Sequence, residues 1–568
     1  MSTAATISVP QTLSLLDGSF SRLAQGVAEN RYALWLGSGI SFGRVDGLSN
    51  VISRVIEHLR TRVVPGHPTC KFTIALEAIL NLASLTADER TRIDLSRPFS
   101  LWPDAEAITR RLVNQYSRLL QIRVHGEDPD YLLWEAIDIV RTFADPSIEP
   151  DVEHFCIAIL VMEGLTSDIA SANWDGLIEK ATNILADKAT MLVVCVRPDE
   201  LQQQPGKAHL FKFHGCAVKA AADQPRYRPY LTARVSQINR WIQDYPAMAN
   251  RLVSLIASKP TLMIGLSGQD ANIQSIFSEA ESTVRWPWPG ERPSLVFSTS
   301  EVGVDQSALL ENVYRDAYTG AGREAIESSA TFPAFGKPLL LALVLHVLAT
   351  KLNTLLERVL SATHDDGERK KLKEGIAALR DKIGEGADAD RFKFILSFIE
   401  KVGRTMGLFR TGQVPTLPTR YLPITSSSVQ ELDADFAVQT SGLSEAAVAV
   451  AVLGLLAKSG VVNVNITDST AFGAGVLEIE SPVAHGKVFF AANGNAALRL
   501  RNNGFVNDSA DTILIHSLEI IQPQTRSPRS APGRTGKSGL REVSISGLIA
   551  DTKTSDDLVQ RFRREVGV

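Results

Sequence analysis

A pentad rich in glycine and serine directly follows an apolar run near the start of the chain. The run is Ala33–Leu36, and the pentad reads Gly37-Ser38-Gly39-Ile40-Ser41. Glycine adds no Cβ and tolerates a positive φ, so a buried strand that ends in such residues lets its backbone approach a phosphate closely. The pentad therefore predicts a phosphate-binding turn at a strand end.

Three later segments stand at the ends of further apolar runs. They are Asn173-Trp174-Asp175, His214-Gly215, and Gly265-Leu266-Ser267 with Asp270. The glycines complete neither of two common motifs, because G-x-G-x-x-G would need glycine at Phe42 and G-x-S-x-G would need glycine at Gln269. An ordinary dehydrogenase and an α/β-hydrolase are therefore disfavoured.

The elements that must position these segments alternate between strand-like and helical patterns. Strands are expected at Ala33–Leu36, Ile169–Ala172, Met191–Val196, His209–Phe213, Thr261–Ile264 and Ser294–Phe297. The alternation predicts an α/β fold with a Rossmann-like parallel sheet. Helices are expected to start at Asp175 and Asp270, because Asp is favoured at helix N-termini.

A long helical stretch interrupts this alternation between about residues 50 and 150. Apolar residues recur at helical spacing over Tyr131–Val140, for example. We interpret the stretch as an inserted helical subdomain that lies over the site.

The whole chain is expected to divide into three domains. Residues 1–335 form the catalytic domain, 336–412 a helical segment, and 413–568 a small α+β domain that opens with a proline-containing linker. Asn493-Gly494, between two apolar runs, predicts a hairpin. The longest apolar run, Leu339–Ala349, is too short for a membrane span and predicts a buried helix.

Composition excludes several classes of protein. The chain has 568 residues, 44% hydrophobic and 21% charged, and a net charge of −4, which is typical of a globular protein and not of a basic nucleic-acid-binding surface. Met1–Pro10 lacks the features of a signal peptide. The four cysteines form no CxxC pair, so we expect a cytoplasmic protein without disulfides or structural zinc.

The four segments together resemble the NAD-binding core of sirtuins. Sirtuins carry, in order, G-A-G-x-S, T-Q-N-x-D, H-G and G-[TS]-S segments. Gly37, Gly39 and Ser41 match the first, with Ser38 in place of alanine, and Asn173 with Asp175 matches the second, with Ser171-Ala172 in place of Thr-Gln. His214-Gly215 and Gly265 with Ser267 match the third and fourth. The resemblance covers about residues 30 to 300. It implies that NAD+ is bound, as substrate rather than as resident cofactor.

The resemblance also implies a role for each residue. Gly37, Ser38, Gly39, Ile40 and Ser41 would contact the pyrophosphate and its ribose, with Gly265, Ser267 and Asp270 across the same cleft. Asp175 would bind a ribose hydroxyl or hold its loop. Asn173 would lie beside the nicotinamide–ribose bond. His214 would be the general base, since an imidazole titrates near neutral pH.

Two departures from the sirtuin pattern bear on the reaction. Deacylating sirtuins carry a four-cysteine zinc module after the H-G segment, where this chain has only Cys216, and their first motif continues differently from Phe42–Leu48. The chain thus looks like the sirtuin-like NAD+ hydrolases of bacterial antiphage defence. This resemblance implies that the chain forms a homo-oligomer and acts with a partner, such as a HerA-like ATPase or a short Argonaute.

Other interpretations remain open. The chain could be an NAD-dependent protein deacylase, or a module that binds NAD without catalysis. His214 could be a core histidine, Asn173 and Asp175 turn and cap residues, and Gly265 with Ser267 an ordinary turn. Cys216 could be a thiol nucleophile.

A basic, proline-rich loop is expected at residues 522–541. It contains Ala531–Ser538, which fits a loose P-loop pattern but lacks the preceding strand and following helix that such a site needs. We expect nucleic acid to be contacted only indirectly or through this loop, and expect no contact with a membrane.

Overall fold

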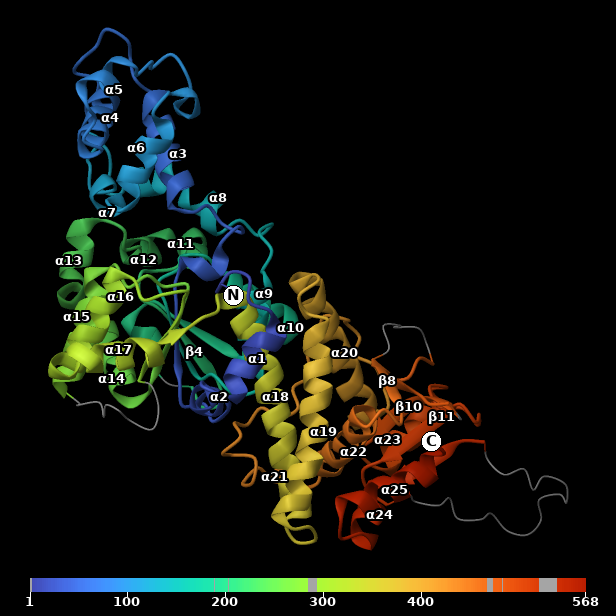
Figure 1. Cartoon of the computed structure of the whole chain (residues 1–568). Helices are drawn as coiled ribbons and strands as arrows, with labels where there is room; N and C mark the ends of the chain where they lie inside the picture. Colours follow the sequence, from blue (N-terminus) through green and yellow to red (C-terminus); the bar gives the residue numbers. More distant parts are fainter. Residues whose placement is uncertain are drawn as a thin grey trace, which may run out of the picture.

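The computed structural model describes residues 3–187, 189–202, 204–283, 294–466, 473–482, 484–519 and 539–568. Within these ranges the chain forms an α/β domain with an inserted helical lobe, a helical segment, and a small mixed sheet near the C-terminus (Figure 1). The expected P-loop-like segment and nearly all of the loop at 522–541 lie outside the described residues.

Seven strands form the larger sheet, in the order β3-β4-β2-β1-β5-β6-β7. Every neighbouring pair is parallel, which confirms the predicted fold class. The strands are β1 (Ala33–Leu36), β2 (Asp168–Ser171), β3 (Leu192–Cys195), β4 (Ala208–Lys212), β5 (Thr261–Ile264), β6 (Leu295–Ser298) and β7 (Thr331–Phe332). β2, β4 and β3 lie on one side of β1, and β5, β6 and β7 lie on the other, so the strand order reverses at β1. Ligands bind at such a switch point in open parallel sheets.

Helices cover both faces of this sheet because its strands are apolar on both sides. Leu34 and Leu36 face one core cluster, whereas Ala33 and Trp35 face the other. The first face is covered by α1 (Val9–Asp17), α2 (Ser21–Ala28), α9 (Val152–Met162), α10 (Leu177–Leu185) and α18 (Gly336–Leu360). The second is covered by α13 (Val235–Asp244), α14 (Pro246–Ser258), α15 (Ala271–Thr283), α16 (Val304–Tyr314) and α17 (Gly320–Ala330).

The predicted helical insertion forms a lobe between β1 and α9, drawn in blue at the top of Figure 1. Its helices are α3 (Leu48–Arg60), α4 (Lys71–Leu82), α5 (Ala87–Thr91), α6 (Ala105–Val113), α7 (Tyr116–Leu119), the π-helix Leu132–Ala136, and α8 (Ile139–Phe143). The helix expected over 131–140 is broken, because Asp138 adopts a left-handed conformation with φ 53° and caps α8. The core of the lobe includes Ala217 and packs against the partly buried Trp174, so the lobe rests on segments that follow β2 and β4.

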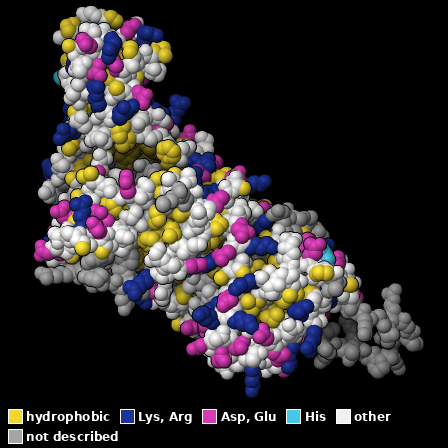
Figure 2. Space-filling view, in the orientation of Figure 1, with side chains coloured by type: hydrophobic (Ala, Val, Ile, Leu, Met, Phe, Trp, Pro, Cys, Tyr) yellow, Lys and Arg dark blue, Asp and Glu magenta, His cyan; other side chains and the backbone are white. Residues whose placement is uncertain are grey.

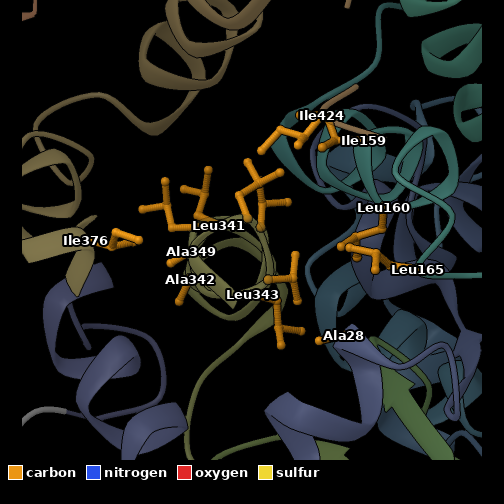
Figure 3. Packing of buried hydrophobic residues seen from close by; sticks show 14 of the residues in the cluster. Ala28, Ile159, Leu160, Leu165, Leu341, Ala342, Leu343, Ala349, Ile376 and Ile424 are labelled. Carbon is orange, nitrogen blue, oxygen red and sulfur yellow. The ribbon is translucent and has the colours of Figure 1, made fainter. Parts of the chain in front are cut away.

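The longest apolar run lies inside α18, which is buried as predicted. By length and composition this helix could cross a membrane, yet most of its apolar stretch is covered by protein. Figure 3 shows Leu341, Ala342, Leu343 and Ala349 radiating from α18 toward residues of other elements, including Ile159 and Ile376. Its Lys351 forms a fully buried ion pair with Glu163 at 2.7 Å.

The helical segment continues with α19 (Asp366–Glu385) and α20 (Arg391–Thr411) and leads into the C-terminal region. The residues expected to form a linker are packed there. Tyr421 is buried, its hydroxyl donates to Glu163 at 2.6 Å, and its N–H donates to the carbonyl of Leu185. A single cluster of buried side chains therefore runs from the sheet domain into the C-terminal region.

The second sheet has five strands in the order β12-β11-β10-β9-β8. They are β8 (Asn463–Ile466), β9 (Leu477–Glu480), β10 (His485–Ala491), β11 (Thr512–His516) and β12 (Arg541–Ser544). Around the sheet lie α22 (Leu443–Lys458), α23 (Gly494–Asn502), α24 (Ile545–Asp551) and α25 (Ser555–Val566), whereas the short helix α21 (Phe436–Gln439) precedes α22 and contacts it.

The hairpin predicted at Asn493-Gly494 is wrong. Asn493 is the N-cap of α23, where its side chain accepts from the N–H of Ala496 at 3.0 Å, and β10 pairs in parallel with β11. Asn favours both turns and N-caps, and a parallel pair requires a crossover helix instead of a tight turn.

Candidate functional site

The loops after β1 and β5 touch through their backbones. The N–H of Gly39 donates to the carbonyl of Gly265 at 3.0 Å, and Gly265 has φ 66°. A Cβ on Gly37 would lie 2.4 Å from the oxygen of Gly265, and one on Gly265 would lie 2.7 Å from the nitrogen of Ile40. Glycine is thus required on both sides, because a Cβ on either loop would overlap the backbone of the other. The two closely packed loops, called the cradle below, lie at the switch point of the sheet.

Ser41 is the centre of a buried hydrogen-bond cluster that also holds Asn173 and Asp175. The Ser41 hydroxyl donates to Oδ2 of Asp175 at 2.9 Å, and Nδ2 of Asn173 donates to the carbonyl of Gly37 at 3.1 Å. The loop after β2 is therefore fixed to the loop after β1, and the amide of Asn173 is held in one orientation.

His154 completes this cluster from the first turn of α9. Its Nδ1 accepts from the backbone N–H of Asp151 at 3.0 Å, so a neutral ring carries its proton on Nε2, which lies 3.1 Å from the Ser41 hydroxyl. Burial lowers the pKa of His154 to about 4, so the ring is neutral at physiological pH. His154 thus donates to Ser41 and leaves the hydroxyl proton for Asp175.

The loops after β2 and β4 are joined by further bonds. The indole N–H of Trp174 donates to the carbonyl of His214 at 2.9 Å. Lys212, which is fully buried, donates to the carbonyl of Asp175 and pairs with Glu179 at 3.0 Å. Asn173 and His214 are thereby held at the carboxyl ends of two neighbouring strands.

His214 is 4% exposed and contacts both the loop that follows β5 and the first turn of α15. Its Nε2 lies 2.8 Å from Nδ2 of Asn272, and its Nδ1 lies 4.0 Å from Oδ2 of Asp270. Burial lowers the pKa of His214 below its usual value, although the charge of Asp270 acts in the opposite direction. The ring is thus kept neutral and able to accept a proton.

The inserted lobe reaches this site through Tyr116, the first residue of α7. Its hydroxyl donates to Oδ1 of Asp270 at 2.9 Å. Figure 2 shows the surface hollowed where the lobe meets the sheet domain, with hydrophobic side chains along the hollow. A separate open pocket of about 830 Å³ lies on the lobe between α3 and α6, and none of the predicted site residues lines it.

The remaining predicted residues also lie on the cradle loops. Ser38 and Ser267 are exposed, whereas the side chain of Ile40 is buried in the core, so only its backbone can face a ligand. Sequence reasoning missed His154, Asn272 and Tyr116. Asn272 stands two residues after Asp270 and could have been noticed, whereas the other two lie on elements far from any predicted segment.

Cysteine chemistry and metal binding find little support in the described part of the chain. Its four cysteines are free, and burial raises the pKa of the Cys216 thiol, which disfavours a nucleophile. Among the described residues no group of three or more His, Cys, Asp or Glu side chains could hold a metal ion.

The comparison with protein families agrees with this geometry. Residues 167–308 match a SIR2-like domain. The match begins just before β2 and includes Asn173, Asp175, His214, Gly265 and Asp270, whereas the pentad after β1 precedes it. No curated protein matches the chain.

A SIR2-like domain implies NAD binding, and such domains are typically found in NAD-consuming enzymes. The residues present fit that ligand. Gly39 and Gly265 are exposed and add no side chain, so their backbone can approach a pyrophosphate closely. A buried amide oxygen of Asn272 without a hydrogen-bond partner suits a polar ligand beside His214.

Proposed function

We propose that this protein is an NAD+ glycohydrolase, which cleaves the nicotinamide–ribose bond with water and releases nicotinamide and ADP-ribose. The observation that carries the proposal is the placement of Asn173 and His214, both buried, at the ends of neighbouring strands beside the Gly37–Gly265 cradle. The SIR2-like match over the same segments supports it.

The residues of the site have distinct tasks in this reaction. Cleavage builds positive charge on the ribose carbon, as in glycoside hydrolysis, so the protein has to position the bond and activate the acceptor. His214, neutral because of its burial, accepts a proton from a ribose hydroxyl or from water. Asn173, whose Nδ2 is held by the carbonyl of Gly37, orients the leaving nicotinamide or the water.

We propose further that this activity depletes NAD+ in phage-infected bacteria, in an oligomer controlled by a partner. The resemblance to sirtuin-like antiphage hydrolases without a zinc module supports this setting. The C-terminal region is the proposed docking surface, because it lies apart from the site described above (Figure 1).

Nicotinamide release from NAD+ tests the proposal. The wild type, Asn173→Ala and His214→Ala are compared, alone and with lysate from phage-infected cells. Asn312→Ala and His485→Ala are matched controls, because neither residue contacts the site. We expect the wild type and both controls to release nicotinamide, and we expect the two site substitutions to abolish the release.

Two results would contradict the proposal. NAD-dependent removal of acyl groups from peptides without net NAD+ hydrolysis would show a deacylase. NAD+ binding without release of nicotinamide under either condition would show a binding module.

A further inference from the structure

Asn272, the second residue of α15, has a half-satisfied side chain beside His214. Its Nδ2 contacts Nε2 of His214 at 2.8 Å, while its Oδ1 is buried and has no hydrogen-bond partner within the described residues. The residue is 3% exposed. Leaving a buried acceptor unpaired costs about 1–3 kcal/mol, so such an atom beside a reactive group points to a ligand that satisfies it.

The contact fixes which nitrogen of His214 carries a proton. An amide NH2 only donates, so the Nε2 that it faces presents its lone pair. The proton of the neutral ring is then on Nδ1, on the side of Asp270, whose Oδ2 lies 4.0 Å away. Nε2 is therefore the basic atom, and in the ligand-free protein Asn272 occupies its lone pair.

Two acceptors thus lie close together. The amide oxygen and nitrogen of Asn272 share one carbon, so Oδ1 lies within about 5.5 Å of Nε2 of His214. Hydroxyl donors approach oxygen acceptors to about 2.7–2.8 Å. A vicinal pair of hydroxyls, as on a ribose ring, offers one donor to each acceptor.

We propose that Asn272 binds the diol of the nicotinamide ribose: one hydroxyl enters between Asn272 and His214 and donates to Nε2, and its neighbour donates to Oδ1. The inference rests on the function proposed above and adds a substrate-binding residue to it. When His214 takes the proton of the first hydroxyl, the ring becomes an imidazolium whose Nδ1–H faces Asp270. Tyr116 holds that carboxylate in place through its hydroxyl.

The first test combines Asn272→Ala with NAD+ analogues that lack either the 2′- or the 3′-hydroxyl of the nicotinamide ribose. Removing the amide is expected to lower kcat/KM for NAD+ by at least about tenfold, the scale of one lost hydrogen bond with an unpaired partner. For the analogue that lacks the hydroxyl bound by Oδ1, the same substitution is expected to change kcat/KM less than threefold. Equal losses for NAD+ and both analogues would overturn the proposal.

A second variant keeps the shape of the side chain. Asn272→Asp replaces the donor that faces Nε2 with an acceptor, so His214 must bind a proton there and can no longer act as a base until a higher pH. The acidic limb of kcat against pH is expected to move upward, while the same exchange at Asn312, on the neighbouring α16, leaves it in place. An unmoved limb in Asn272→Asp would count against the proposal.

A measurement that needs no activity separates this inference from the proposed function. Nitrogen NMR of histidine-labelled, ligand-free protein, with the His214 signal assigned through His214→Gln, reports which ring nitrogen is protonated. A proton on Nδ1 is expected in the wild type, and a proton on Nε2 would refute the arrangement. If the wild type shows the expected tautomer but hydrolyses no NAD+, the proposed function fails while the contact stands.

Discussion

Glu153 gives the sharpest quantitative prediction, because its carboxyl is buried without a full set of partners. The residue is 5% exposed on the first turn of α9, packs near Gly336, and has an Oε2 without a hydrogen bond. Burial raises its pKa from 4.5 to about 7, against the opposing charges of Lys337 and Arg44.

The shift determines the sign and size of a pH effect on stability. Between pH 4.5 and about 7 the folded protein binds more protons at this site than the unfolded chain, so stability falls as the pH rises through this window. Each pKa unit is worth 1.36 kcal/mol, which gives a total loss of about 3 kcal/mol above pH 7. Glu153→Gln removes the ionisation, and its stability relative to the wild type is expected to rise by that amount.

Urea unfolding at pH 5, 6, 7 and 8 measures this difference. The wild type and Glu153→Gln are compared with Glu324→Gln, a control at an exposed position on α17. The advantage of Glu153→Gln should grow from pH 5 to pH 7 and then level off, whereas the control shows no such growth. An advantage that is independent of pH, or that grows toward acid, would refute the reasoning.

Three further predictions concern the site itself. Gly265→Ala places a Cβ 2.7 Å from the nitrogen of Ile40 at a residue with φ 66°, so it should destabilise the protein by about 2–4 kcal/mol. It should also weaken NAD+ binding in calorimetric titration, and an unchanged affinity would exclude the cradle as part of the NAD+ site. Asp270→Asn removes a charge that raises the pKa of His214, so the acidic limb of kcat/KM should move to lower pH, and an upward move would contradict the assignment. Ser41→Ala leaves two buried partners of the hydroxyl unsatisfied, so the free energy of unfolding measured in urea should fall by about 2–5 kcal/mol. An unchanged free energy of unfolding would show that the cluster does not stabilise the protein.

Much of the sheet could be predicted from the sequence, because its strands are short apolar runs bounded by glycine and polar residues. β1 and β5 match their predicted bounds, and β2, β3, β4 and β6 differ from theirs by one residue at each end. The two-residue β7 was missed, since a strand so short carries no periodic pattern.

The candidate site could be predicted only where its residues follow strands directly. Ser41, Asn173 and Asp175 do so, and the parallel sheet brings them together. His154 lies 113 residues after Ser41, beyond the inserted lobe, on a helix whose sequence is apolar and unremarkable for chemistry. Tyr116 is one of several tyrosines in a helical stretch. Only the folded chain shows that both reach the site.

The proline-containing segment at 413–423 shows a different limit of sequence reasoning. Proline and glycine indicate the absence of a helix, but they say nothing about burial. Tyr421 supplies a hydroxyl to Glu163, and just beyond the segment a Cβ on Gly164 would lie 2.0 Å from the carbonyl oxygen of Ser426. This segment is thus packed closely against the sheet domain.

That packing decides how the proposed docking role of the C-terminal region can be tested. Asp151, the N-cap of α9, pairs with Arg44 at 3.1 Å and with Lys337 at 2.8 Å, so the loop after β1 and the start of α18 share one carboxylate. α18 in turn packs against α22 in the same core cluster. Deleting residues 424–568 would expose the buried face of α18 and disturb the site together with any partner surface. Exposed positions of the C-terminal region, such as Phe436 at 75% exposure, are therefore the ones to substitute, because they change a docking surface and leave this core intact.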